Sequence, residues 1–425
     1  MRVKVKRSKG FKGEIKIPPD KSISHRALFI ASLSSGISEI ENLSFAQDCV
    51  ASLKCLGKIG VKFNIRADKI KVEGKALYNF REPDCILNAQ NSGTTARFLI
   101  GILAGQKFFS VIDGDSSLRK RPMKRVADPL RRMGAYIEGR NNSENLPIAI
   151  KGGKLKGLKY ALPIPSAQLK SALIFAGLLS KEGVEIYEPI PSRDHTERML
   201  IHFGADIKKN NGVIKVTGGK TFGPQKITVP GDFSSSSFFL ASALMVENSE
   251  VIMPNICLNP TRIGFIRVLK KMGANLKVFN EKTLCNEPTG TIFVSSSSLK
   301  GVSINSNEIP TLIDEIPLLM LLATQAKGKT ALKGAKELRI KETDRLKSMT
   351  ENLRKMGIDI IEKEDGFVIE GPQKLKGAKV SSYGDHRIAM TMAVAGLIAD
   401  GITEIEDFEC YEVSFPNFYT LLKKW

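Results

Sequence analysis

Short runs in which apolar and polar residues alternate recur along the chain, and longer apolar runs follow them. Val213–Val216 and Gly366–Ile369 show the alternation, which is typical of half-buried strands. The longer runs begin with small or polar residues, as helices do. These predicted helix starts lie near Lys21, Asn91, Ser166, Asp232, Asp314 and Asp385.

A second pattern repeats, in which a basic helix end is followed by a glycine and then by a strand. A sixth copy is predicted across the termini, with Phe418–Trp425 as the end of its helix and Arg2–Lys6 as its strand. Each glycine is expected to end its helix in the left-handed conformation. The five complete copies carry Gly60, Gly134, Gly204, Gly273 and Gly357.

Each copy is predicted to hold about two helices and three or four short strands. A copy of this size cannot bury its own apolar face, so the copies must pack on one another. Extended segments around Pro18-Pro19 and Pro230-Gly231 lie at equivalent points of the repeat. The sequence therefore predicts two lobes of three copies each, with residues 20–230 in one and residues 1–19 plus 231–425 in the other.

Composition points to a partner that carries negative charge. The chain has 425 residues, with 64 Lys and Arg against 44 Asp and Glu, and a formal net charge of +20. Such an excess suits nucleic acid, an acidic membrane surface or small anionic metabolites. One Trp and seven Tyr offer few stacking platforms, which disfavours a protein that binds single strands.

The cysteines and the apolar runs narrow the class of protein further. Six cysteines without a Cys-x-x-Cys pair favour reduced thiols, and no cluster of ligand residues has metal-site spacing. The basic N-terminus lacks the apolar stretch of a signal peptide, and the runs Phe233–Val246 and Ile388–Ala399 are too short to span a bilayer. We therefore expect a cytoplasmic protein without a metal and without a membrane partner.

Cations and hydroxyl residues gather at the predicted helix starts. A helix start attracts anions, so a lysine or arginine there is unfavourable unless it serves a ligand. Lys21, Ser22 and Arg26 share one such start, and Gly93 lies in a loop that lets an anion approach the backbone. A single Ser or Asp at a helix start is usually a cap. The recurrence of cations at the same phase of several copies indicates instead a common site for anions.

Two further basic segments belong to this pattern. Residues 119–125 carry five positive charges in seven positions, which would ordinarily form a solvated face. On a helix, Glu342 and Arg345 are spaced to pair, whereas Lys341 and Arg345 repel unless an anion or carboxylate lies between them.

Six motifs follow one another along the chain: Asp20–Ala27, Asn91–Arg97, Arg121–Met123, Ser166–Gln168, Lys341–Leu346 and Asp385–Arg387. In this order and spacing they resemble the 5-enolpyruvylshikimate-3-phosphate synthases, also called 3-phosphoshikimate 1-carboxyvinyltransferases. The resemblance covers nearly the whole chain, and Ser166–Gln168 and Arg193–Glu197 are similar to the bacterial class II branch. It implies an α/β fold of two lobes, an inside-out barrel of six βαβαββ copies that closes over its substrates.

The resemblance also implies which residues hold the two substrates. Shikimate 3-phosphate would be held by Lys21, Ser22, Arg26, Ser166, Ala167, Gln168, Arg193, Asp314 and Lys341. Phosphoenolpyruvate would be held by Lys21, Gly93, Arg121, Gln168, Arg345 and Arg387. Two positions depart from the family pattern: Val413 stands where many relatives have a lysine, and Glu337 replaces an asparagine and is left out of the site.

The reaction implied is an addition followed by an elimination, in the pathway to chorismate and the aromatic amino acids. The 5-hydroxyl of shikimate 3-phosphate adds to C2 of phosphoenolpyruvate while C3 gains a proton, and the intermediate then loses phosphate and a C3 proton. Asp314 is predicted to take the hydroxyl proton, and Lys21 and Glu342 to transfer protons at C3 and to the leaving phosphate. No cofactor is expected. Glyphosate is expected to inhibit, and the chain is expected to act as a monomer without nucleic acid.

Two other functions stay open from the sequence. The UDP-N-acetylglucosamine enolpyruvyl transferases share the repeat, but they have Lys-Asn at the position of Lys21-Ser22 and a loop cysteine that Gly114–Arg119 lacks. The net charge would also suit an RNA-binding protein, and the related RNA 3′-terminal phosphate cyclases use such repeats on RNA. Retention on RNA that depends strongly on salt would support that second alternative.

Overall fold

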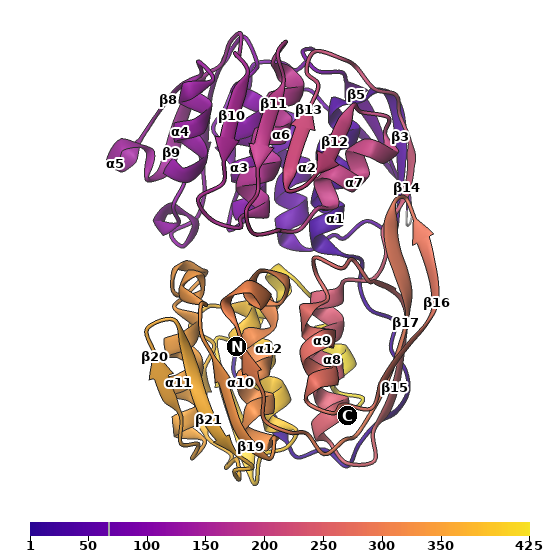
Figure 1. Ribbon diagram of the computed structural model, residues 1–425, viewed down its shortest axis with the longest axis vertical. Helices are drawn as coiled ribbons and strands as arrows, with labels where there is room; N and C mark the ends of the chain where they lie inside the picture. The colour runs from indigo at the N-terminus through magenta and orange to yellow at the C-terminus, as the bar shows by residue number, and fades with distance from the viewer. Residues whose placement is uncertain (67–68) are drawn as a thin grey trace. The chain divides into compact units, whose positions relative to one another are not determined.

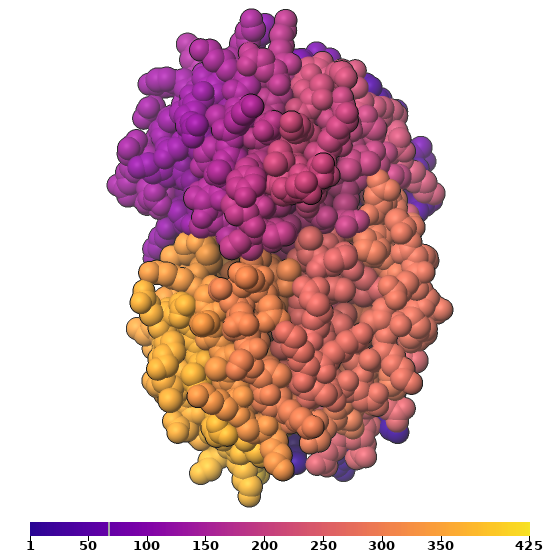
Figure 2. Space-filling view, in the orientation of Figure 1, coloured from indigo at the N-terminus to yellow at the C-terminus, as the bar shows by residue number. Residues whose placement is uncertain are grey.

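The computed structural model describes residues 1–66 and 69–425, and the chain divides into two compact units. The N-terminal unit comprises Pro19–Val229 and Thr283–Glu287. The C-terminal unit comprises Met1–Pro18, Pro230–Lys282 and Pro288–Trp425. The two chain ends both lie in the C-terminal unit (Figure 1), and its first residues, in indigo, come to the surface beside its orange and salmon segments at the lower edge of Figure 2. The five residues Thr283–Glu287 lie in the range that the sequence assigned to the other lobe.

The N-terminal unit is built from three copies of one arrangement of strands. Each copy has a four-stranded sheet in which the first pair of strands is parallel and the other two pairs are antiparallel. The first sheet runs β14 (Lys226–Thr228), β3 (Ser35–Glu41), β5 (Lys69–Lys75) and β4 (Lys62–Arg66). The second runs β6 (Leu87–Asn88), β7 (Phe109–Asp113), β9 (Asn145–Lys151) and β8 (Tyr136–Gly139). The third runs β10 (Leu158–Ala161), β11 (Val184–Tyr187), β13 (Val213–Val216) and β12 (Ile207–Asn210).

The helices of this unit fall into two kinds. One long helix from each copy is buried on all sides: α1 (Lys21–Leu33), α3 (Gly93–Leu103) and α6 (Ala167–Leu179). A helix that is apolar all round belongs in a core. The other helices cover the sheets: α2 (Gln47–Lys58), η1 (Leu118–Lys120), α4 (Lys124–Arg132), the short α5 (Arg140–Ser143) and α7 (His195–His202).

Three phenylalanines, one from each copy, meet at the centre of the N-terminal unit. The ring centroids of Phe29, Phe98 and Phe175 lie 5.2 to 6.3 Å apart, and none of the three is exposed. Edge-to-face contacts at this distance favour one mutual orientation of the rings. The aromatic cluster therefore holds α1, α3 and α6 together inside the three sheets.

The C-terminal unit repeats the same plan, and its first strands come from the start of the chain. Its sheets run β16 (Leu276–Leu284), β17 (Glu287–Ser295), β15 (Glu250–Cys257), β2 (Lys12–Glu14); β18 (Ser303–Ile304), β19 (Gly328–Leu332), β21 (Gly366–Gly371), β20 (Ile361–Lys363); and β1 (Val3–Lys6), β23 (Ile402–Glu406), β22 (Lys379–Ser381). The buried helices are α8 (Phe233–Met245), α10 (Ile316–Gln325) and α12 (His386–Gly396). The remaining helices are α9 (Gly264–Lys271), η2 (Ser306–Thr311), η3 (Ile313–Glu315), η4 (Lys336–Ile340), α11 (Arg345–Lys355), η5 (Phe408–Val413) and α13 (Phe418–Leu422).

The predicted repeat is confirmed in its details. The six helices predicted from their small or polar starts begin at or within two residues of the expected positions. The glycines after the helices adopt the left-handed conformation, with φ between 81° and 100°. The sixth copy is split between β1 and α13, as expected. Within the described residues, no helix combines the length and the apolar character needed to cross a membrane.

The turn between β16 and β17 is attached to the N-terminal unit. Arg198 donates from Nη1 to the Asn286 carbonyl at 3.1 Å, and the Asn286 amide donates back to the Arg198 carbonyl at 3.3 Å. The Cys285 thiol lies 3.7 Å from the Lys226 carbonyl. These contacts account for the grouping of Thr283–Glu287 with residues 19–229.

Two neighbouring glycines after β9 should respond very differently to substitution by alanine, because only one of them is closely packed. A Cβ on Gly152 would lie 2.1 Å from the Gln106 carbonyl oxygen and 2.2 Å from that of Leu103, whereas a Cβ on Gly153 would meet nothing within 4 Å. We expect Gly152→Ala to lower the free energy of unfolding by about 1–3 kcal/mol because backbone carbonyls must move. Gly153→Ala should change it by less than about 0.5 kcal/mol. Thermal melts of both variants check this, and equal melting temperatures would contradict it.

Candidate functional site

Five of the six buried helices are capped by small polar residues at the starts that the sequence pointed to, whereas α10 follows Glu315 without a side-chain cap. In each case a side-chain oxygen accepts a backbone N–H of the first turn, as N-caps do. Asp20 caps α1, Ser92 caps α3, Ser166 caps α6, Asp232 caps α8 and Asp385 caps α12. The ordinary interpretation of these residues as caps is therefore correct, and the cations beside them need a separate explanation.

Lys21 opens α1 and is paired with a carboxylate from the second helix of the same copy. Its Nζ lies 2.8 Å from Oδ2 of Asp48 on α2, and both side chains are largely buried. The pair offsets the unfavourable position of a cation at a helix start. The neighbouring His25 is fully buried and its Nδ1 lies 2.8 Å from the Ser52 hydroxyl. Burial and the charges of Lys21 and Arg26 lower the pKa of His25 well below its usual value, so its ring is neutral at pH 7.

Arg26 lies one turn further along α1, where its guanidinium group is buried by side chains of α6 and α7. Its Nε donates to Thr196 Oγ1 at 2.7 Å, its Nη1 to the Ser22 carbonyl at 2.8 Å and its Nη2 to Ser171 Oγ at 3.3 Å. The guanidinium carbon also lies 5.1 Å from the centre of the Phe98 ring. Burial lowers the pKa of Arg26 to about 10, and the group stays cationic at neutral pH.

The starts of α3 and α6 contact each other through Gln168. The Gln168 amide nitrogen donates to Thr94 Oγ1 at 2.8 Å, and Arg97 Nη1 donates to the Gln168 side-chain oxygen. Arg97 Nη2 donates to the Pro122 carbonyl at 2.9 Å. A Cβ on Gly93 would lie 2.8 Å from Arg97 Nη1 and 3.5 Å from Arg121 Nη1. The absent side chain at Gly93 therefore leaves room beside two guanidinium groups.

The other predicted residues of this unit lie around the same helix starts. Arg121 is buried and donates to the Asn91 side-chain oxygen at 2.6 Å and to the Asn91 carbonyl at 3.2 Å. Ser166 and Ala167 begin α6 and are half-buried. Arg193 is half-buried in the segment just before α7. The structure thus brings Gly93 and Arg121 together directly, and it joins Arg26 to the α6 start through Ser171.

In the C-terminal unit, Arg345 is the centre of a cluster of carboxylates. Its Nε lies 2.8 Å from Asp385 Oδ2, its Nη2 lies 2.6 Å from Glu342 Oε2 and its Nη1 lies 3.3 Å from Asp314 Oδ1. Burial alone would lower the pKa of Arg345, but the three carboxylates raise it above its ordinary value. Arg345 is therefore permanently charged and already fully paired within this unit.

Arg387 and Glu315 extend this cluster across the starts of α8, α10 and α12. Arg387 donates to the Asp314 carbonyl at 3.0 Å and to the Ser234 hydroxyl at 3.1 Å. Arg262 binds the buried Glu315 carboxylate through both terminal nitrogens, at 3.0 and 3.1 Å. The Ser234 hydroxyl donates to the same carboxylate at 2.6 Å. Asp314, Glu342, Arg345 and Arg387 are thus close together within this unit.

The segment before α11 differs from its sequence interpretation. Glu342 and Arg345 do pair, but α11 begins only at Arg345, with Asp344 as its cap. The helical spacing used for Lys341 and Arg345 therefore does not apply, and Lys341 is a half-buried residue that follows η4. The prediction of a helix here was wrong because Asp344, a strong cap, starts the helix later than the charge pattern suggested. Val413 is half-buried at the end of η5.

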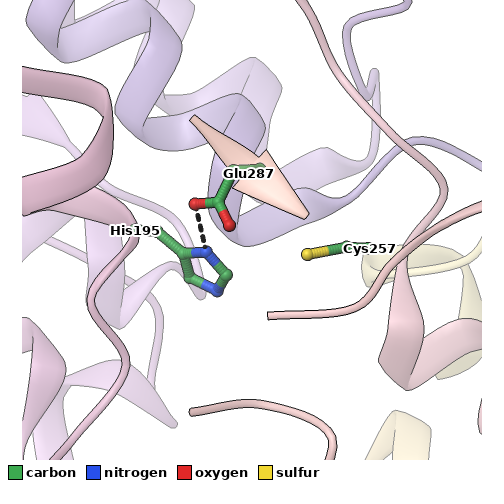
Figure 3. A group of neighbouring side chains, drawn as sticks. All are labelled: His195, Cys257 and Glu287. Atoms are coloured by element: carbon green, nitrogen blue, oxygen red, sulfur yellow. Dashed lines mark hydrogen bonds and ion pairs between the residues drawn. The ribbon is translucent and has the colours of Figure 1, made fainter. Parts of the chain in front are cut away.

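His195, the first residue of α7, binds the carboxylate of Glu287, the first residue of β17. Its Nδ1 lies 2.8 Å from Glu287 Oε1, and both residues are almost fully buried (Figure 3). Cys257, also drawn there, belongs to the C-terminal unit. The sequence treated His195 as structural and assigned no metal ligands, and the expectation of a metal-free enzyme stays a prediction.

The sequence interpretation missed several residues that hold the predicted ones in place. The missed residues are Asp48, Arg97, Thr196, Arg262, Glu315 and Asp385. Arg97 and Asp385 were part of the quoted motifs but were not given a role. Asp48 and Thr196 lie at the first turns of second helices of the repeat, and that shared position was the signal available in the sequence.

Comparison with known proteins identifies the family. Residues 5–422 match the family model described as EPSP synthase (3-phosphoshikimate 1-carboxyvinyltransferase). A 3-phosphoshikimate 1-carboxyvinyltransferase from Petrotoga mobilis is 51% identical over 100% of this chain and 99% of its own length. One from Thermodesulfovibrio yellowstonii is also 51% identical, over 99% of this chain and 98% of its own length.

Solved structures agree with this match. An EPSP synthase from Acinetobacter baumannii superposes with a TM-score of 0.89 at 39% identity and covers 100% of this chain and 98% of that one. The enolpyruvyl transferase NikO from Streptomyces tendae shares the fold, with a TM-score of 0.79 at 16% identity over 99% of this chain and 96% of that one. The predicted two-lobed inside-out α/β fold is confirmed. The chain therefore belongs to the EPSP synthase (3-phosphoshikimate 1-carboxyvinyltransferase) family.

Proposed function

We propose that this chain carries out the reaction of its family with the residues that lie at the helix starts within each of its two units. The reaction transfers the enolpyruvyl group of phosphoenolpyruvate to the 5-hydroxyl of shikimate 3-phosphate and releases phosphate. It belongs to the shikimate pathway. The observation that carries the assignment of residues is that, in each unit, the motifs of the family lie at helix starts that contact one another.

The N-terminal unit supplies the cations that hold the anionic groups. Phosphate and carboxylate groups are bound best by guanidinium pairs and by helix starts. Arg97 and Arg121 donate to oxygens of Gln168, Pro122 and Asn91, which holds both guanidinium groups at the starts of α3 and α6. Their terminal nitrogens lie next to Gly93, where the backbone carries no side chain, and this supports a role for Arg121 and Gly93 in binding phosphoenolpyruvate.

Shikimate 3-phosphate is assigned to the α1 and α6 starts together with residues of the C-terminal unit. Arg26 uses three of its N–H groups within the protein, which leaves it fixed in one orientation. The residues proposed for this substrate are Lys21, Ser22, Arg26, Ser166, Ala167, Gln168, Arg193, Asp314 and Lys341. The arrangement of the first six around two contacting helices supports the assignment.

The C-terminal unit supplies the carboxylates that move protons. Asp314 is proposed to accept the proton of the 5-hydroxyl as that oxygen forms a bond to C2 of the enolpyruvyl group. Lys21 and Glu342 are proposed to deliver and remove the proton at C3 and to assist the leaving phosphate. Arg345 and Arg387 hold Asp314 from two sides, at 3.3 Å and 3.8 Å from its carboxylate oxygens. Phosphoenolpyruvate must therefore exchange places with a carboxylate to reach Arg345.

The first test is the reaction itself. We expect the purified chain to release phosphate from phosphoenolpyruvate when shikimate 3-phosphate is present. Release should be absent with UDP-N-acetylglucosamine and unchanged in excess EDTA, because every group assigned to the reaction is a side chain of the protein. A coupled phosphate assay measures the rate. Release with the nucleotide sugar, or a loss of rate in EDTA that a divalent ion restores, would contradict the proposal.

Replacing Lys21 separates chemistry from folding. We expect Lys21→Met to lower kcat by about 100-fold or more, as for loss of a proton-transfer group. The melting temperature should fall only slightly, because the cation is unfavourable at the helix start and the Asp48 pair merely offsets this. The matched control is Lys75→Met, which removes a lysine of similar exposure that pairs with Glu73 at 2.9 Å on β5. Near-normal turnover of the Lys21 variant, measured beside that control, would refute the role.

Gly93 is expected to decide the sensitivity to glyphosate. Glyphosate should compete with phosphoenolpyruvate, and because it is the longer molecule it should need the space at Gly93 more. The Cβ of Gly93→Ala would press on Arg97 Nη1, the flexible end of a side chain, so folding should be affected little. We expect the inhibition constant of glyphosate to rise far more than the KM of phosphoenolpyruvate.

Gly57→Ala is the control for this substitution, because a Cβ there meets nothing within 4 Å. Inhibition kinetics and thermal melts of both variants make the comparison. Equal rises in the two constants for Gly93→Ala, or a wild type that millimolar glyphosate leaves unaffected, would defeat the prediction.

A further inference from the structure

A lysine without solvent exposure lies in the N-terminal unit, one turn after the start of α6. Lys170 Nζ lies 2.9 Å from Glu188 Oε1 and 2.8 Å from Glu197 Oε1, and all three side chains are almost fully buried. The nitrogen also donates to the Ser192 carbonyl at 3.3 Å. None of these three ionisable residues takes part in the reaction proposed above.

The two carboxylates that share Lys170 are attached to different parts of the unit. Glu188 follows β11 and accepts the backbone N–H of Ser192 at 2.9 Å and its hydroxyl at 2.6 Å, so it binds its own loop. Glu197 is on α7, directly after Thr196. Lys170 thus joins α6 both to a loop and to α7.

The residues adjacent to Lys170 and Glu197 in the sequence link this ion cluster to Arg26. Ser171 follows Lys170 on α6 and Thr196 precedes Glu197 on α7, and their hydroxyl oxygens are 2.6 Å apart. Both hydroxyls accept a hydrogen bond from the Arg26 guanidinium, at 3.3 Å and 2.7 Å. The Lys170–Glu197 pair therefore sets how α6 and α7 are aligned where they hold Arg26.

The charges of this cluster also act on Arg26. One cation shared by two carboxylates leaves one negative charge in the interior. Burial lowers the pKa of Arg26, and the charge of Glu197 is the largest effect that opposes this. A buried ion cluster is weak evidence for a role in stability, since apolar residues of similar volume often stabilise as well or better. A functional reason for its presence is therefore worth testing.

We propose that Glu197 is a positioning residue for Arg26: paired with Lys170, it fixes Thr196 and Ser171 so that the Arg26 guanidinium presents its free N–H groups to the acidic acceptor substrate. This role rests on the proposed function, in which Arg26 binds shikimate 3-phosphate. Glu197 touches no substrate itself. Its effect should therefore appear in the binding of one substrate and not in the chemical step.

The test uses the full-length chain and the substitution Glu197→Gln, which keeps the shape and removes the charge. We expect the KM of shikimate 3-phosphate to rise about tenfold, the scale of one charge-assisted hydrogen bond. The KM of phosphoenolpyruvate and kcat should stay within about twofold of wild type. Glu197→Asp, which keeps the charge, should restore part of the lost affinity. Calorimetric titration with shikimate 3-phosphate alone gives the same comparison without turnover.

Glu188→Gln is the matched control, because it removes the other carboxylate from the same lysine on the side of the loop. We expect it to lower the melting temperature about as much as Glu197→Gln while leaving the KM of shikimate 3-phosphate within about twofold. Equal rises in that KM for both variants, or equal rises for both substrates in Glu197→Gln, would overturn the inference. If the wild type is active and Glu197→Gln has the same KM for shikimate 3-phosphate, only the role of Glu197 is overturned. If the wild type is inactive, the proposed function is overturned as well.

Discussion

The burial of one helix from each repeat is the constraint on which the rest of the structure depends. α1, α3 and α6 are buried on all sides, and Phe29, Phe98 and Phe175 hold them together at the centre of their unit. A helix leaves backbone N–H groups without an intrahelical partner at its start. Caps, cations and the glycine that leaves room for an anion therefore all gather at the helix starts, which contact each other because the helices do.

The two units use these helix starts differently. In the N-terminal unit, Arg97 and Arg121 donate to carbonyl and side-chain amide oxygens and lie beside Gly93 at the start of α3. In the C-terminal unit, Arg345 is bound by three carboxylates and Arg262 by a fourth. Guanidinium groups at helix starts suit the binding of phosphate and carboxylate groups, whereas carboxylates held by arginines suit proton transfer at a fixed position. The division of roles proposed here follows from this difference between the two sets of helix starts.

Much of this arrangement could be predicted from the sequence, because the same pattern of helix starts and glycines occurs in several copies of the repeat. The helix starts were predicted to within two residues, and the glycines that end helices were recognised because only a left-handed residue fits there. The partners of the site residues could not be predicted in the same way. Asp48 is 27 positions from Lys21 in the same copy, and Thr196 is 170 positions from Arg26 in another copy, so each pairing exists only after the helices pack. The segment at Lys341 was misjudged because charge spacing alone does not show where a capped helix begins.

The first turns of the second helices of the repeat position residues of the site. The long buried helices are enclosed by neighbours, so a change in their side chains meets the close packing of the interior. The second helices reach the site through their first turns: α2 brings Asp48 to Lys21, α7 brings Thr196 to Arg26, and α11 brings Arg345 to Asp385. Each of these contacts sets the orientation or the charge of a residue on a buried helix. Differences between members of this fold in what they bind should therefore be sought at the first turns of the second helices as well as in the motifs themselves.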